Sequence, residues 1–310
     1  MGIKHTTVAT GINDATKQIS VNKWNEAHSI DISLELPVSA PVAPSDGLLS
    51  IYASKIGGRT MLMQKGPSGL ETSIQPNLGG NKVAFWNPVG GTNTVPAVFG
   101  MNTLIALGTA TSRSNLATNF VTRMSRLGYV SAATVAGLSG IRESLAKYTT
   151  GAGSGMGGFF FRTRFCVSDG ATVAGARMFI GLSANTAAPT NVEPSTLINS
   201  IGVTKLSTSN NLQIVCGGAV AGTPIDLGID FPAHTSSIDA YELSLFAASS
   251  DTTISYQVTR LNTGHIATGT ITTNIPVSNI MMCMQIWRCN NATASAVGID
   301  IGNIYIETDY

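Results

Sequence analysis

Five runs in the last seventy residues decide the fold of this chain: YELSLFAAS (241–249), TISYQVTRLN (253–262), ATGTITTNIP (267–276), IMMCMQIWRC (280–289) and VGIDIGNIYIETD (297–309). Each run is about as long as a strand and is rich in Val, Ile, Thr and aromatic residues, which favour strands. Only short polar or glycine-bearing turns separate the runs, so we expect antiparallel pairing. A sheet with one apolar face needs a second layer to cover it. We therefore predict an all-β protein with a C-terminal antiparallel jelly-roll β-sandwich.

Two of these runs indicate which side chains face the core. In the second run, apolar residues occupy every second position from Ile254 to Val258, and the register slips near Arg260. A period of two places such residues on one face of a strand. In the last run four isoleucines carry the apolar side, and three polar residues fall elsewhere: Ile299, Ile301, Ile304 and Ile306, against Asp300, Asn303 and Glu307.

The composition argues against several classes of partner. Of the 310 residues, 43% are hydrophobic and only 11% are charged, and the net charge is +1. Such a low share of charge suits a many-stranded β protein, or a chain with much of its surface buried in an assembly. So small a net charge provides no electrostatic basis for binding nucleic acid, and no apolar stretch approaches the ~20 residues that span a bilayer. We therefore expect neither nucleic-acid binding nor membrane insertion.

Residues 1–45 are predicted to form an extended anchoring segment and linker. The stretch LPVSAPVAPS that ends this segment cannot be helical, because prolines interrupt it. Before it, VNKWNEAH (21–28) has the form of a short helical turn whose one large apolar side chain is Trp24. Burial of that side chain against a partner would contribute ~2 kcal/mol. We interpret Trp24, Asn25 and His28 as residues that dock on a partner; the alternative is a local clasp onto the chain's own domain.

Two further domains follow this segment in the predicted organisation: a small β domain over residues 46–110 and the jelly-roll sandwich over residues 111–310. Gly57-Gly58 and Gly66-Pro67 mark turns between short strands of the small domain. A few short strands bearing large apolar residues such as Met61 make too thin a layer to be stable alone. We therefore expect copies of this small β domain to intertwine.

Several stretches resemble segments of tailed-bacteriophage virion proteins. Toward the N-terminal end they are GIKHT (2–6), ISVNKWNEAH (19–28), DGLLSIYASKIGGRTM (46–61), GPSGLETSIQPNL (66–78) and VAFWNP (83–88). In the C-terminal part they are RLGYVSAAT (126–134), DLGIDFP (226–232), VTRLNTG (258–264) and IGNIYIETD (301–309). The family that these stretches resemble groups tail-fibre, appendage and head or neck decoration proteins.

This resemblance implies a homotrimer that folds in the host bacterial cytoplasm and joins the virion. The N-terminal segment would attach it to other virion proteins of the capsid, collar or tail. The distal jelly-roll would resemble concanavalin-like lectin domains. Three functions then stay open: a receptor-binding fibre whose sandwich binds host cell-surface polysaccharide, a capsid or collar decoration protein with no receptor role, and a polysaccharide depolymerase.

No stretch of the sequence forms a recognisable catalytic set. Residues 153–158 read GSGMGG, a GxGxxG pattern, but a strand-like FFF follows directly, so no helix N-terminus could hold a phosphate. The four histidines lie in separate segments without a second ligand at useful spacing. The densest carboxylates, Asp226 and Asp230, are expected to cap a turn or face solvent. We expect a non-enzymatic protein with no cofactor and no metal site.

Aromatic residues and cysteines within the strands are expected mainly in the core. In a lectin-like domain one of four aromatic side chains could instead stack on a sugar: Tyr241, Tyr256, Trp287 or Tyr305. Core packing is the more frequent fate of such residues. The four cysteines form no CxxC pair and each lies in an apolar run, which predicts free, buried thiols.

Overall fold

The structure, a computed structural model, describes residues 39–67, 69, 71–73, 82–89, 95–153, 156–234 and 236–308. Trp24, Asn25 and His28, the predicted docking residues, lie outside this range. The described strands are β1 (Ser50–Ile56), β2 (Arg59–Lys65), β3 (Glu71–Ser73), β4 (Lys82–Trp86), β5 (Ile105–Leu107), β6 (Thr109–Ser112), β7 (Leu127–Val130), β8 (Leu138–Arg142), β9 (Phe159–Val167), β10 (Arg177–Ser183), β11 (Ser200–Lys205), β12 (Gln213–Gly217), β13 (Ile225–Asp226), β14 (Ala240–Ala247), β15 (Ile254–Arg260), β16 (His265–Ile271), β17 (Cys283–Cys289) and β18 (Gly298–Thr308). The described helices are the one-turn α2 (Phe120–Arg123) and the 3-10 helix η1 (Pro194–Thr196).

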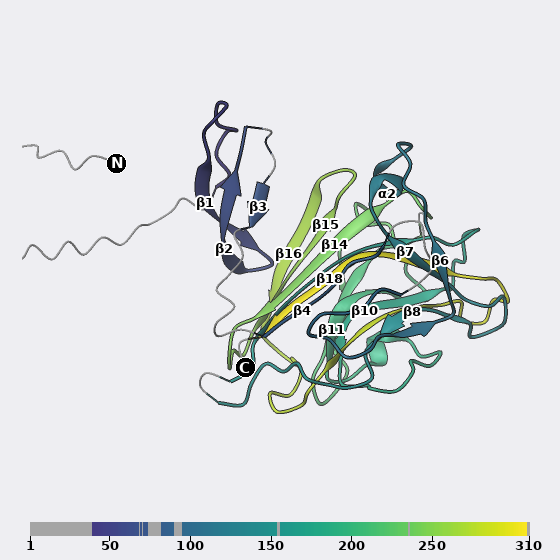
Figure 1. Cartoon of the computed structure of the whole chain (residues 1–310). Coiled ribbons are helices and arrows are strands. Elements are labelled where there is room, and N and C mark those ends of the chain that lie inside the picture. Colours follow the sequence, from purple (N-terminus) through teal and green to yellow (C-terminus); the bar gives the residue numbers. More distant parts are fainter. Residues whose placement is uncertain are drawn as a thin grey trace, which may run out of the picture. The chain divides into compact units, whose positions relative to one another are not determined.

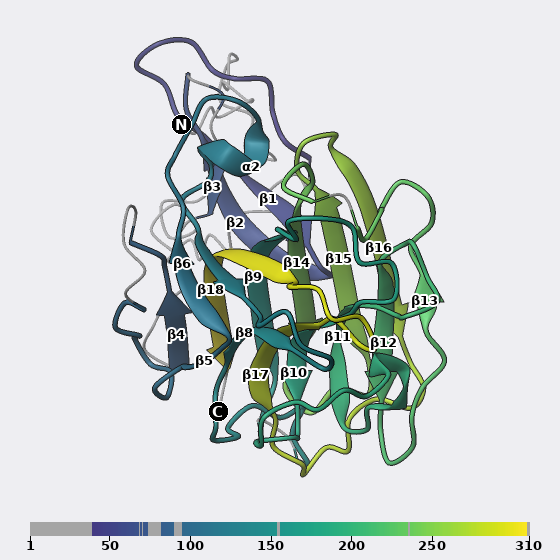
Figure 2. The same ribbon diagram turned by 90° about the vertical axis from the view of Figure 1, so that its right-hand side faces the viewer.

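Two antiparallel sheets form a β-sandwich. The seven-stranded sheet has the order β13-β12-β11-β10-β17-β8-β5. The eight-stranded sheet has the order β16-β15-β14-β9-β18-β7-β6, with β4 paired to β18 beside this path. Figure 1 shows the two layers, with β14 and β18 in one and β10 and β11 in the other, and in Figure 2, turned by 90°, the strands of the two layers lie in front of one another. The predicted all-β class and antiparallel sandwich are confirmed.

The five C-terminal runs form β14 to β18, as predicted, but they divide between the layers: β17 joins the seven-stranded sheet and the other four join the eight-stranded sheet. In β18 the register against β9 shifts between Ile301 and Asn303. Such a bulge inserts one residue, and it therefore returns Ile304 and Ile306 to the face that Ile301 occupies. The four predicted isoleucines of this strand are all fully buried.

The core lies between the two sheets. Alternate residues of β9, such as Phe161 and Phe165, meet alternate residues of β10 and β17, such as Ile180 and Ile286, in one apolar cluster. Each of these side chains is fully buried. Because successive side chains of a strand point to opposite faces, the residues between them lie on the outer faces of the sandwich.

The strands expected within residues 46–110 belong to three different sheets. β1, β2 and β3 form a three-stranded sheet of their own. β4 instead pairs with β18, β5 with β8 and β6 with β7, so these three strands extend the sandwich sheets. The boundary placed after residue 110 falls within β6. Intertwining concerns other copies of the chain and stays a prediction.

The three-stranded sheet packs on the outer face of the eight-stranded sheet. Its buried residues Tyr52, Ile56 and Met63 form one cluster with Phe160 of β9. The Arg59 guanidinium lies 5.2 Å from the centroid of the Phe160 ring and pairs with Glu307. These contacts combine apolar burial with a cation–π interaction and an ion pair in which the Glu307 side chain is only 2% exposed.

The turn between β1 and β2 approaches the eight-stranded sheet closely. The Gly57 amide donates a hydrogen bond to Gln257 Oε1 of β15 at 3.2 Å. At Gly58 the backbone has φ +85°, and a Cβ there would lie 2.4 Å from Ser255 Cβ. The GG sequence is therefore required both by the conformation of the turn and by the space beneath it.

Candidate binding groove

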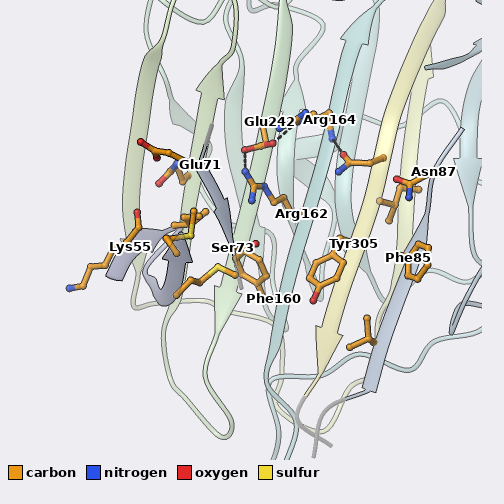
Figure 3. A pocket seen from close by; sticks show the side chains of 18 of the residues that line it. Lys55, Glu71, Ser73, Phe85, Asn87, Phe160, Arg162, Arg164, Glu242 and Tyr305 are labelled. Carbon is orange, nitrogen blue, oxygen red and sulfur yellow. Dashed lines mark hydrogen bonds and ion pairs between the residues drawn. The ribbon is translucent and has the colours of Figure 1, made fainter. Parts of the chain in front are cut away.

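A groove of about 860 Å³ lies on the outer face of the eight-stranded sheet, with the three-stranded sheet as one wall. Its floor comes from β9, β14, β18 and β4, and Phe99 closes the side beyond β4. Figure 3 shows its labelled side chains, with Lys55, Glu71 and Ser73 on the three-stranded sheet and Phe85 and Asn87 at the opposite side. This volume is within the range of ~300–1,000 Å³ that is typical of ligand sites.

The strand register places one continuous row of side chains across the floor of the groove. The partners in this row are Gln257, Ser244, Arg162, Tyr305, Phe85 and Phe99, in that order. Neighbouring strands are about 4.8 Å apart, so the row from Arg162 to Phe85 extends about 10 Å. The Gly57 turn covers the row at Gln257 and Ser244. The part from Arg162 to Phe99 borders the groove.

A charged cluster lies at the centre of the groove. Glu242 is almost fully buried, and its two carboxylate oxygens bind different cations: Arg162 Nη2 at one and Arg164 Nε at the other, the latter at 2.6 Å. Burial raises the pKa of Glu242, but the charges and hydrogen bonds of the two guanidiniums outweigh it and hold this pKa below its usual value. The Glu242 carboxylate is therefore ionised and fixed in place.

Two stacked phenylalanines form the far side of the groove. The rings of Phe85 and Phe99 are 5.3 Å apart between centroids, with an interplanar angle of 29°. Reciprocal backbone hydrogen bonds of 2.9 and 3.0 Å join the same two residues. The side chains are nevertheless 41% and 58% exposed. A rigid, exposed aromatic pair is unusual in a monomer surface and offers a stacking platform.

The structure separates the four aromatic candidates of the sequence. Tyr241 and Tyr256 are buried in the core between the sheets, and Trp287 is buried in a second apolar cluster, which confirms apolar packing as the fate of all three. Tyr305 instead lies half-buried in the groove, where its hydroxyl donates a hydrogen bond to Glu307. Sequence reasoning missed Phe99 and the charged cluster. The role of Phe85 had a local signal, because Ala84 and Trp86 on either side face the core and a strand alternates.

The carboxylates and glycines considered as chemical sites have structural roles. Asp226 Oδ1 accepts a hydrogen bond of 2.9 Å from the Gly228 amide, which confirms the predicted turn cap. Asp230 is 62% exposed and lies 3.5 Å from His265. The GSGMGG stretch leads into β9 rather than into a helix, so it lacks the helix N-terminus that a dinucleotide site requires.

The cysteines and the other metal-binding types of side chain form no metal-binding cluster of three or more among the described residues. All four cysteines are free and buried, as predicted. Within residues 39–308, apart from the undescribed gaps, His, Cys, Asp and Glu side chains gather in no group of three that could hold a metal ion. In the same part of the chain, no helix is both long and apolar enough to cross a membrane.

No protein-family model matches this sequence, and no curated protein matches it. Solved structures are similar to it at low identity. Peanut lectin with a nine-residue peptide is 14% identical, with 74% of this chain and 97% of that chain covered and a TM-score of 0.46. Lectin II from Ulex europaeus is 12% identical over 73% and 97%, with a TM-score of 0.47. A protein of unknown function from Shewanella oneidensis MR-1 is 14% identical over 76% and 90%, also with a TM-score of 0.47.

Proposed function

We propose that this chain is a non-enzymatic binding protein whose groove takes a saccharide. The observation that carries this proposal is the open row of Arg162, Tyr305 and Phe85, continued by Phe99. A sugar ring has an apolar face of C–H groups and a rim of hydroxyl groups. The aromatic rings suit the face, and the guanidinium with the neighbouring amides of Asn87 and Asn303 suits the rim.

The state of the groove carboxylates favours binding over hydrolysis. Glycoside hydrolysis needs one protonated carboxyl group as the acid. The hydrogen bond from Lys65 lowers the pKa of Glu71, and the two arginines lower that of Glu242 despite burial. Both carboxylates that line the groove are therefore ionised at neutral pH, and neither suits the role of a general acid.

We extend the proposal to location: the chain is an appendage of a tailed-phage virion, with the sandwich displayed and the segment around Trp24 attached to other virion proteins. Support comes from the sequence resemblance and from the low share of charged residues. In this setting the ligand is a host cell-surface polysaccharide, and the attached form is a homotrimer.

Binding to a panel of bacterial surface polysaccharides tests the saccharide proposal, with the full chain as the probe. Replacement of Phe85 by Ala removes one ring of the exposed pair, and we expect about tenfold weaker binding, equivalent to ~1.4 kcal/mol. Phe120→Ala is the matched control, because Phe120 is equally exposed, at 39% against 41%, but lies on α2 away from the groove.

Three results of this experiment would contradict the proposal. Absence of binding across the host's own polysaccharides would favour a decoration protein with no receptor role. Equal losses in Phe85→Ala and Phe120→Ala would place binding outside the groove. Release of oligosaccharides from the bound polysaccharide would instead identify a depolymerase.

The virion assignment has its own test. Deletion of residues 1–35 should leave a soluble, folded trimer that no longer joins virions, as measured by size and by the protein content of purified particles. In a separate experiment, a label on the C-terminal end of the full-length chain should appear on intact virions, and its position would distinguish the head, the neck and the tail. Incorporation of the truncated chain at the normal level would refute the anchoring role of Trp24 and its neighbours.

A further inference from the structure

The groove has an excess of positive charge. Three cations line it, Lys55, Arg162 and Arg164, against two carboxylates, Glu71 and Glu242. Glu71 already receives a hydrogen bond of 2.9 Å from Lys65, a cation that lies outside the lining. Glu242 is shared between two guanidiniums, so this cluster keeps one net positive charge. The groove is therefore electrostatically suited to an anionic group.

Arg164 is the group that could receive such an anion. Its Nε binds Glu242, whereas its two terminal amino groups have no hydrogen-bond partner among the described residues. The side chain is 42% exposed, unlike the buried acid beneath it. Asn303 Oδ1 accepts a hydrogen bond of 2.8 Å from the Arg164 amide, which fixes the backbone that carries the guanidinium. Glu242 therefore orients Arg164 and leaves its outer edge available.

The free edge of a guanidinium matches a carboxylate. The planar fork donates parallel hydrogen bonds that fit two oxygens in one plane, and a charge-assisted pair of this kind is stronger than a neutral hydrogen bond. In Figure 3, Arg162 and Arg164 converge on Glu242, and Tyr305 and Phe85 follow on the next two strands. The distance from β9 to β4 is about 10 Å, which accommodates a sugar ring beside its own acidic substituent.

We infer that the groove binds an acidic saccharide, with a sugar carboxylate on the free edge of Arg164 and the sugar rings against Tyr305 and the Phe85–Phe99 pair. This inference rests on the proposed saccharide-binding function and adds the class of saccharide. A uronic acid unit of a surface polysaccharide has the required chemistry: a carboxylate attached directly to a pyranose ring.

The experiment compares one oligosaccharide in two forms, uronic acid-containing and carboxyl-reduced, the second having primary alcohols in place of the carboxylates. Binding of both to the unmodified full chain is measured by calorimetry at low and high salt. We expect at least tenfold tighter binding of the acidic form at low salt, with a preference that weakens as salt is added, because the arginine is partly exposed. The comparison needs no variant, so it does not depend on the folding of a mutant.

Arg164→Gln then assigns the preference to one residue. This variant should lower the ratio of the two affinities toward one, whereas Arg123→Gln, a change at an exposed arginine on α2, should leave the ratio as it is. A thermal melt of each variant verifies folding. Phe85→Ala should weaken both forms by similar factors, because it removes stacking and leaves the charge.

The outcomes separate this inference from the proposed function. Equal binding of both forms, with Phe85→Ala weakening each, would overturn the acidic preference and leave saccharide binding standing. If the chain bound neither of these two forms and no other saccharide, both the acidic preference and the proposed saccharide-binding function would be overturned. An Arg164-dependent preference for a sulfated or phosphorylated saccharide over the carboxylated one would overturn the assignment of a carboxylate.

Discussion

The outer faces of the two sheets have opposite fates. On the seven-stranded sheet, Phe179 and Trp287 lie side by side with ring centroids 6.2 Å apart, and neither is more than 1% exposed. Leu197, from the segment between β10 and β11, packs against the apolar cluster that contains them. On the eight-stranded sheet, Phe85 and Phe99 stack as closely and stay about half exposed.

This difference shows that an aromatic pair in a strand does not by itself mark a binding site. Both pairs are apolar, both lie on outer faces and both are held by sheet register. What separates them is a covering segment. The seven-stranded sheet is closed by its own connection, whereas the eight-stranded sheet is covered at Gln257 and Ser244 by the Gly57 turn and borders the groove beyond it.

The largest effect expected from this comparison is on stability. Trp287→Ala removes the centre of the closed cluster and should lower the free energy of unfolding by about 3–5 kcal/mol. Phe99→Ala removes a half-exposed ring of the open pair and should change it by under ~1 kcal/mol. Urea unfolding of both variants measures these changes in the free energy of unfolding. A comparable loss of stability in both would mean that the exposed pair contributes to the stability of the fold as the closed pair does.

A smaller effect on the free energy of unfolding should appear at alkaline pH, because the protein contains buried thiols and one of them, Cys283, lies on the closed face. Cys283 Sγ donates to the carbonyls of Ser183 and Asn185, at the start of the covering segment. Burial raises the pKa of Cys283 to about 11, and burial in the core between the two sheets raises that of Cys216 to about 12. The unfolded value is about 8.5, so the folded state keeps the proton longer. The stabilisation that comes from the raised pKa of each thiol is complete below pH ~8.5 and is lost as the pH rises toward the pKa of the folded state.

Urea unfolding at several pH values between 7.5 and 10.5 measures this loss. Each such thiol contributes a slope of up to about 1.4 kcal/mol per pH unit in this window. Lys205 acts in the opposite direction, because burial lowers its pKa to about 8 and stability from this group rises between pH ~8 and its unfolded value of about 10.4. Cys283→Ala should flatten the decline. A decline of unchanged slope in that variant would exclude Cys283 as a source.

The smallest effect concerns the turn that covers part of the open face. Gly58→Ala places a methyl group against Ser255 in a backbone conformation of φ +85° and should destabilise the chain by ~1–3 kcal/mol. Gly47→Ala is the matched control, since its φ of +78° is similar but nothing lies within 4 Å of the added Cβ. The difference between the two variants isolates the close approach of the turn. Equal losses of stability in the two variants would show that the cost comes from the backbone conformation alone and not from contact with Ser255.

The same change also tests the wall of the groove. If the Gly57-Gly58 turn is displaced from Ser255, the three-stranded sheet no longer holds its position, and saccharide affinity should fall together with stability in Gly58→Ala alone. Retention of full affinity in that variant would indicate that the floor of the groove binds without this wall.

Much of the fold could be predicted from the sequence because strand patterns are local. The alternation from Ile254 to Val258 and the isoleucines of the last run identified strands and core faces, whereas the bulge between Ile301 and Asn303 appears only in the register of β18 against β9. The turn cap at Asp226 was likewise predictable, because its partner, the Gly228 amide, is two residues away. The division of the 46–110 strands among three sheets could not be predicted, since the pairings of β4 with β18 and of β5 with β8 join residues far apart in the sequence.

The sequence by itself determined that this chain is all-β, which side chains point inward, and that its cysteines are free. Only the tertiary structure decided which outward side chains meet. Arg162 and Glu242 are separated by 80 residues, and the two registers of β9 against β14 and β18 bring them and Tyr305 into one groove. The physical reason is that a period of two assigns each residue to a face, whereas the choice of neighbouring strand, and of the segment that covers it, depends on contacts no local pattern contains.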